Sequence, residues 1–323
     1  MIDPLVLARA VHFAASTLMV GALVFDVFVV RPLAPGRRMH LPAVARLIWI
    51  AAALALVSGF AWLLLVSAAI GGRPPGQALS DGTVTTVLTE TRFGHVWLIR
   101  GALLVVAMFA FAWKRAWIAL LASAGAIAAI AITAHAGARE GAFAPVLLAS
   151  DMLHLLAAST WFGSLPPLAI LLLSNDIALP DRALATRRFS TLGIGAVAIL
   201  IVSGFINAYA MLGQPSAMVA TSYGRILAVK LTLFAAMLAC AAINRLCWTP
   251  RLPSANALGA IVRLTLVETA LGLGIMLAVA VLGTLDPPFQ MHREMGDGAQ
   301  RVIVHVIAVR ASPVERKLPD ISG

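Results

Sequence analysis

Two histidines in matching surroundings are the strongest chemical feature of the chain. His12 opens the segment HFAASTLMVGAL, and His154 opens the segment HLLAASTWFGSL. Both lie in apolar runs, where an ionisable side chain is costly and is a functional candidate by default. Imidazole nitrogens bind copper, zinc, iron and nickel, and opposed histidines in a helix bundle can hold a haem iron. The alternative is that both histidines bond only to backbone carbonyls or to Ser16, Ser58 and Ser203.

The composition places these residues in a membrane protein. Of 323 residues, 61% are hydrophobic and 12% are charged, and the mean hydropathy is +0.94. A soluble domain is about half apolar and a quarter charged, so a soluble enzyme is excluded. At about 20 residues per span, the apolar runs predict an all-α protein with eight transmembrane helices. They cover residues 5–30, 43–70, 93–113, 116–137, 146–173, 186–213, 224–247 and 257–285.

The excess of basic residues predicts the orientation. The net charge is +10, and Lys and Arg are concentrated in the first, third, fifth and seventh connections between helices. Because such loops face the cytoplasm, we predict both termini on the periplasmic or extracellular side. This topology explains the charge without a nucleic-acid partner. The two cysteines, Cys240 and Cys247, exclude a disulfide framework and are best interpreted as packing residues.

This orientation brings four histidines to the outer half of the bundle. His12 and His154 lie about 10–12 Å below the outer ends of their helices, at 1.5 Å per residue. His95 begins the third helix, and His135 lies near the outer end of the fourth. Asp151, one turn before His154, could orient that imidazole as a hydrogen-bond acceptor. We therefore take the four histidines as candidate metal ligands.

Two basic residues also lie within apolar runs. Arg100 and Lys230 each follow a glycine by six positions, in Phe-Gly and Tyr-Gly contexts. An unpaired charge in the bilayer is expensive, so we expect ion pairs with Glu268 or Asp26. Handling of anions or protons is the alternative.

Matches in the same order indicate an internal duplication. The histidine segments are followed in each half by Val-Ser-Gly-Phe, at 57–60 and 202–205, and then by the Gly-to-base spacing. We predict two four-helix repeats, residues 1–137 and 145–285, in the same orientation and related by an axis along the membrane normal. The shared glycines fit close approach of helices at the interface.

Residues 286–323 form a predicted short periplasmic tail, with one strand or hairpin near 301–309. Its Met291, His292 and Met295 carry soft ligand atoms that could capture Cu(I). The alternative is a flexible segment with incidental methionines.

These segments resemble the copper resistance D family of bacterial inner-membrane proteins (CopD/PcoD and the membrane core of the YcnJ proteins). The resemblance extends over residues 1–285 and implies eight spans and copper uptake or resistance, alongside a periplasmic copper-binding partner. It is carried by His154 to Gly163, Arg188 to Ser190, Val202 to Asn207, Tyr223 to Lys230, Glu268, and Leu282 to Leu285.

The sequence thus predicts copper transport or handling at the inner membrane, with copper held by the outer histidines and passed inward along the repeat interface. Motifs for nucleotide binding and hydrolysis (P-loop, G-x-S-x-G, H-E-x-x-H) and C-x-x-C are absent, so we expect no ATP-driven pump and no catalytic residues. The main rival is a haem b-binding membrane redox protein with His12 and His154 as axial ligands. A third hypothesis is a purely structural membrane subunit.

Overall fold

Eight membrane-length helices make up the computed structural model, which describes residues 3–33, 41–133, 141–285 and 287–288. All regular structure in these residues is helical. The predicted all-α class and number of spans are confirmed. The sixth span begins at Leu179 rather than at 186, because residues 179–185 continue the same helix. The spans are Pro4–Leu33, Pro42–Gly71, Arg92–Ala112, Ala116–Thr133, Ala144–Leu173, Leu179–Leu212, Ser222–Arg251 and Ala255–Leu282.

The described residues form thirteen α-helices with short π and 3-10 turns. The first half contains α1 (Pro4–Val24, continued by turns to Leu33), α2 (Pro42–Gly71), α3 (Pro75–Ser80), α4 (Thr83–Glu90), α5 (Arg92–Ala112), α6 (Ala116–Ala128) and α7 (Ile130–Thr133). The second half contains α8 (Ala144–Trp161), η3 (Phe162–Ser164), α9 (Leu165–Leu173), α10 (Leu179–Leu212), α11 (Ala217–Ala220), α12 (Ser222–Ile243), η4 (Asn244–Trp248), η5 (Thr249–Arg251) and α13 (Ala255–Leu282).

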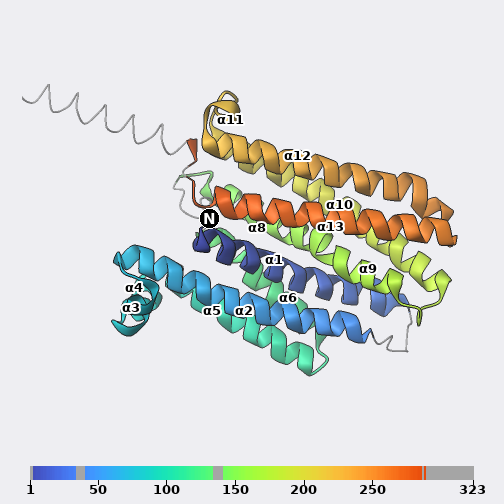
Figure 1. Ribbon diagram of the computed structural model, residues 1–323, viewed down its shortest axis with the longest axis horizontal. Helices are drawn as coiled ribbons and strands as arrows, with labels where there is room; N and C mark the ends of the chain where they lie inside the picture. The colour runs from blue at the N-terminus through green and yellow to red at the C-terminus, as the bar shows by residue number, and fades with distance from the viewer. Residues whose placement is uncertain (1–2, 34–40, 134–140, 286, 289–323) are drawn as a thin grey trace, which may run out of the picture.

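The helix α1 lies at the centre of the bundle and contacts α2, α6, α8 and α13. In Figure 1, α10 and α12 lie on one side of it and α2 and α5 on the other. The short helices α3, α4 and α11 gather at the end of the bundle where the N-terminus lies. One buried core is built mainly from α1, α2, α5 and α6. A second is built mainly from α8 to α10, α12 and α13, and it also contains Phe25, Val29 and Val30 from the end of the first span.

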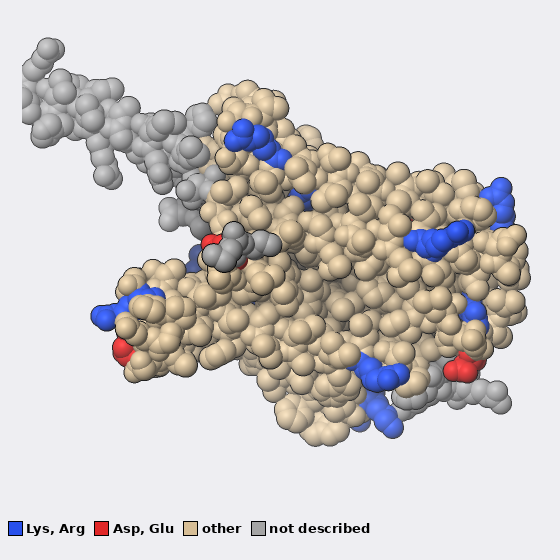
Figure 2. Space-filling view, viewed as in Figure 1, with Lys and Arg blue, Asp and Glu red and all other residues tan. Residues whose placement is uncertain are grey.

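The flank of the bundle is almost free of charge. Figure 2 shows Lys and Arg side chains toward the two ends, with uncharged residues between them. Large apolar side chains of the membrane-length helices are exposed, such as Phe109 on α5 and Phe205 on α10. A surface of this kind is suited to the hydrocarbon interior of a bilayer.

The helices α5 and α12 begin in the same way. The hydroxyls of Thr91 and Thr221 each accept a hydrogen bond from the backbone N of a glycine three residues later, Gly94 and Gly224, at 3.0 Å. A Cβ on either glycine would lie about 2 Å from a backbone oxygen of the preceding short helix. The glycines of the two matched segments therefore allow the same tight turn into the membrane.

The backbones of α1 and η3 touch directly. A Cβ on Gly21 would lie 2.1 Å from the carbonyl carbon of Gly163, and one on Gly163 would lie 2.1 Å from the oxygen of Thr17. The hydroxyl of Ser164 donates to the oxygen of Gly21 at 2.8 Å. The close approach expected from the matched glycines is confirmed at this crossing.

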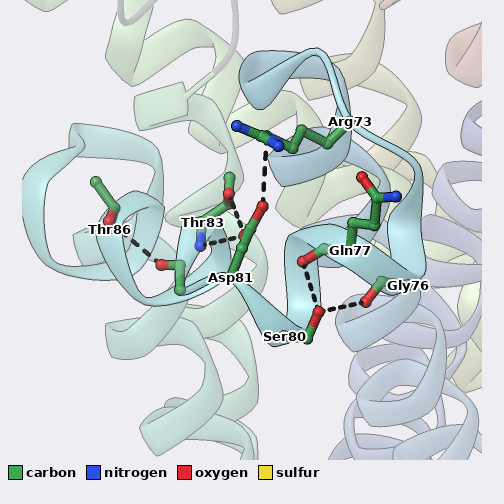
Figure 3. Close-up of polar contacts among 8 residues, drawn as sticks. Arg73, Gly76, Gln77, Ser80, Asp81, Thr83 and Thr86 are labelled. Carbon is green, nitrogen blue, oxygen red and sulfur yellow. Dashed lines mark hydrogen bonds and ion pairs between the residues drawn. The ribbon is translucent and has the colours of Figure 1, made fainter.

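The connection expected as a loop between the second and third spans contains the two short helices α3 and α4 (Figure 3). The Asp81 carboxylate joins them: it accepts from the Thr83 hydroxyl at 2.6 Å and from the Thr83 backbone N at 3.0 Å. The Arg73 guanidinium lies 3.4 Å away. The sequence around Pro74, Pro75 and Gly76 predicted a loop, because proline and glycine usually interrupt helices. A proline is nevertheless compatible with the first turn of a helix, and α3 begins at Pro75.

We predict that the start of α4 loosens in acid. The hydrogen bond from the Thr83 hydroxyl, together with the Thr83 backbone N–H and Arg73, holds the pKa of Asp81 below its ordinary value of 3.8. Because the pKa of Asp81 is lower in the folded than in the unfolded protein, the charged carboxylate stabilises the fold fully at pH values above the unfolded pKa. This stabilisation is lost as the pH falls through the folded pKa. Hydrogen exchange of the first α4 amides should show this acid step. Asp81→Asn keeps the acceptor oxygen and should abolish the step; an unchanged step would contradict the assignment.

Candidate functional site

His12 lies in the first half of α1, is enclosed by the bundle and is 3% exposed. Its Nδ1 lies 2.9 Å from the oxygen of Ala55, and its Nε2 is hydrogen-bonded to Nη2 of Arg100. A guanidinium can only donate, so Nε2 is the acceptor and the imidazole proton is on Nδ1. Both ring nitrogens of His12 are therefore occupied.

A cluster of cations and aromatic rings surrounds His12. The rings of His12 and Trp62 are 5.5 Å apart, and the Cζ atoms of Arg9 and Arg100 each lie 5.5 Å from the Trp62 ring. Arg9 also donates to the oxygen of Gly283 at 2.6 Å. No described carboxylate forms an ion pair with either arginine. This environment favours a neutral imidazole and opposes a bound cation while Arg100 remains in place.

His154, in α8, has one nitrogen available. The hydroxyl of Ser203 donates to the oxygen of Ile199 at 2.6 Å, so it accepts the Nδ1 proton of His154 across 2.9 Å. Among the described residues, Nε2 of His154 has no hydrogen-bond partner. Its lone pair is therefore free to bind a metal ion.

The surroundings of His154 carry charges of both signs. Oδ1 of Asp151 accepts from Nδ2 of Asn207 at 3.3 Å. Lys230 is close enough to interact electrostatically with both Asp151 and His154. The carboxylate partly offsets the ammonium group, so a cation is less disfavoured here than beside His12.

The two histidines make corresponding contacts. His12 lies against Ser58-Gly59, with Oγ of Ser58 3.5 Å from Nδ1 and a Gly59 Cβ position 3.1 Å from the ring. His154 lies against Ser203-Gly204 in the same manner, with the Gly204 Cβ position 3.4 Å from the ring. Each also faces the matched basic residue of the third span in its half. These are the hydrogen bonds expected if the histidines fix packing. They leave Nε2 open to a metal ion in His154, whereas Arg100 occupies Nε2 of His12.

The other predicted ligands do not join this pair in the described structure. His95 is exposed at the start of α5, where its Nε2 lies 2.7 Å from the oxygen of Thr89. Within the described ranges, no three or more His, Cys, Asp or Glu side chains are grouped closely enough to hold a metal ion. The remaining predicted ligands lie outside the described residues: His135, Met291, His292 and Met295. The predicted strand at 301–309 lies outside them as well.

The expected ion pairs of the buried basic residues are wrong. Asp26 pairs with Arg31 at 3.0 Å, on its own helix. Glu268 accepts from Nδ2 of Asn244 at 2.8 Å, near the end of α12 that is remote from Lys230. Arg100 is bonded to His12 instead, because both side chains lie at the same depth on adjoining parts of the bundle.

Arg9 and Trp62 are site residues that the sequence reasoning missed. Arg9 precedes His12 by three residues and so lies on the same face of α1. An arginine inside the first apolar run was a usable signal for this cluster.

Two family profiles match most of the chain. Residues 1–146 match the N-terminal domain of copper resistance protein D-like proteins, and residues 183–282 match copper resistance protein D. The chain belongs to the copper resistance protein D family. The family and the apolar helices together establish a copper-related protein that crosses the membrane several times.

Several relatives support this membership of the copper resistance protein D family. The copper transport protein CutJ of Bacillus subtilis (strain 168) is 31% identical over 296 residues, which are 87% of this chain and 52% of CutJ. This chain thus spans about half the length of CutJ. Copper resistance protein D of Pseudomonas syringae pv. tomato is 31% identical over 63% of this chain and 72% of its own length. The inner membrane protein YebZ of Escherichia coli (strain K12) is 29% identical over 86% of this chain and 97% of its own length.

No solved structure matches this member of the copper resistance protein D family. The names of the first two relatives describe transport and resistance rather than an enzymatic reaction.

Proposed function

We propose that the chain transports copper across the bacterial inner membrane and binds the ion first at Nε2 of His154. The observation that carries the proposal is the free Nε2 lone pair, held in position because Nδ1 is bonded to Ser203. An imidazole fixed through its other nitrogen is a common metal ligand. Asp151, one turn earlier on α8, offsets the positive charge of the incoming ion.

His12 is proposed as a second, conditional ligand. Its Nε2 becomes available when Arg100 moves away, since Nδ1 remains bonded to Ala55. The guanidinium thus holds His12 closed to cations in the described conformation. A ligand that alternates between Arg100 and copper can both accept the ion and release it.

The proposed topology places this site near the periplasm. The basic odd-numbered connections would face the cytoplasm and both termini the periplasm. Copper would then come from the outer side, from a periplasmic copper-binding protein. It would move inward along the interface of two four-helix repeats, residues 1–137 and 145–285, whose matched histidines make corresponding contacts.

A haem at the same histidines is the competing function. Axial ligation by both residues would also require Arg100 to leave His12. The metal content and the visible spectrum of the purified protein therefore distinguish the two ligands.

We predict that His154→Ala strongly weakens copper binding. Loss of a residue that merely supports a ligand lowers metal affinity by about 10- to 100-fold, so loss of the ligand should reduce affinity by about 100-fold or more. The measurement is copper bound to purified protein, together with copper uptake into vesicles that contain it.

His95→Ala is the matched control, because this exposed histidine is hydrogen-bonded to Thr89 at the α4–α5 junction, and its replacement should leave binding unchanged. A strong Soret band in the wild-type protein would replace the copper proposal with haem. Equal copper binding by wild type and His154→Ala would remove His154 from the site.

A further inference from the structure

A pocket lies in the half of the bundle away from the histidines. It is formed where α12 ends and α10 begins, and its lining includes Trp161, Ser190, Asn244, Arg245, Thr265 and Glu268. His154, by contrast, contacts Ser203 in the second half of α10 and interacts electrostatically with Lys230 in the first half of α12. The two sites are therefore separated along the length of the helices.

Glu268 is the buried acidic group of this pocket. It is 2% exposed and forms no ion pair with a described residue. A buried carboxylate without a paired cation is expensive, and the usual solution is to bind a proton or a cation. Glu268 requires one of these in the membrane.

Asn244 provides a hydrogen-bonding group for either state of the carboxyl. Its Nδ2 donates to Oε1 of Glu268 at 2.8 Å, whereas its Oδ1 is buried and has no hydrogen-bond partner. A half-turn of the amide exchanges the two groups, so that Oδ1 accepts from the O–H of a protonated carboxyl. The same side chain can thus stabilise the charged and the neutral form in turn.

The charged surroundings fit a proton better than a metal cation. Arg245 lines the pocket and donates to Oγ of Ser190 at 2.7 Å, with an exposed side chain. Cys240 lies one turn before Asn244 on α12, and its thiol adds no fixed charge. The positive charge of Arg245 opposes the binding of any cation, but a bound proton leaves the carboxyl neutral, whereas a divalent metal ion would leave a net positive charge beside the arginine.

We propose that Glu268 is a proton-binding site that exchanges protons through this pocket at the end of the bundle where α12 ends. The site is independent of the proposed copper function, because it uses none of the histidine contacts. It gives the protein a group that can take up and release one proton inside the membrane.

The test uses dicyclohexylcarbodiimide, an apolar reagent that modifies protonated carboxyl groups within membranes. The full-length protein in lipid vesicles is treated from about pH 5 to about pH 9, and the adduct is located by mass spectrometry. We expect an adduct on Glu268 that decreases as the pH rises. Asn244→Ala should move the midpoint up by about one pH unit, since the hydrogen bond to the charged form is the stronger of the two that are lost.

Two comparisons keep the result interpretable. Glu268→Gln should lose the adduct and retain the elution volume of the wild type, and Asp151, which lies beside Lys230, should be labelled less. A recovered Glu268 peptide with no adduct, or with the same adduct at every pH, would overturn the proposal. Protection by sodium without pH dependence would overturn it too and assign a metal cation instead. None of these outcomes depends on whether the protein binds copper.

Discussion

Replacing Gly163 with alanine is expected to remove most of the folded protein from the membrane. The new methyl group would lie 2.1 Å from the oxygen of Thr17 and 3.1 Å from the Cα of Gly21. These atoms belong to the backbone and cannot rotate away as a side chain can. Overpacking costs about 1–3 kcal/mol and sometimes more, and a clash between two backbones should exceed about 3 kcal/mol. The yield of monodisperse protein and its thermal unfolding midpoint measure the effect.

Gly195→Ala is the matched control for this experiment. Gly195 also lies within a membrane helix, α10, but its Cβ position is open. Alanine is favoured over glycine in a helix by about 0.5–1 kcal/mol, so this variant should be as stable as the wild type or more stable. Gly21→Ala should resemble Gly163→Ala. A Gly163→Ala protein with the wild-type unfolding midpoint would show that α1 and η3 do not cross as described.

The number of spans could be predicted because hydropathy alone determines it. The glycines at the crossing were also visible, since Gly21 and Gly163 occupy the same place in two matching segments. Short elements outside the membrane carry a weaker signal. The helices α3 and α4 are too short for an apolar period to stand out, and Asp81 joins them through hydrogen bonds that no sequence pattern encodes.

The partners of the buried charges could not be predicted from the sequence. His12 is the ninth residue of α1 and Arg100 is the ninth residue of α5, so the sequence could predict that they lie at a similar depth. What was missing is the rotation of each helix about its axis and the choice of neighbours, which packing determines. Complementary charge alone suggested Glu268 as a partner, but that carboxylate faces Asn244 in the other half of the bundle.

Arg100→Met is expected to make the protein bind copper more tightly. The guanidinium is bonded to Nε2 of His12, the nitrogen that a copper ion would need. Two unit charges 4 Å apart repel by about 4 kcal/mol at an effective dielectric constant of 20. Because each 1.4 kcal/mol is a factor of ten, affinity should rise by roughly 100- to 1000-fold. Methionine fills a similar volume and carries no charge, which suits the membrane interior. A competition titration with a copper chelator measures the gain.

The gain should depend on His12. In the double variant His12→Ala, Arg100→Met, the extra affinity should disappear, because the nitrogen that Arg100 covers is gone. Arg225→Gln is the control for charge alone, since Arg225 is exposed on α12 and bonded to Ser222. An increase that survives His12→Ala would mean that Arg100 acts on copper at a distance rather than by covering His12.

Tighter binding should also slow transport. If Arg100 returns to His12 as copper leaves, the arginine competes with the ion and speeds its release. Without that competitor, Arg100→Met should bind copper well but deliver it into vesicles more slowly than the wild type. Faster uptake together with tighter binding would instead make Arg100 a barrier to entry. The pair of measurements therefore assigns Arg100 either to the release of copper or to its exclusion.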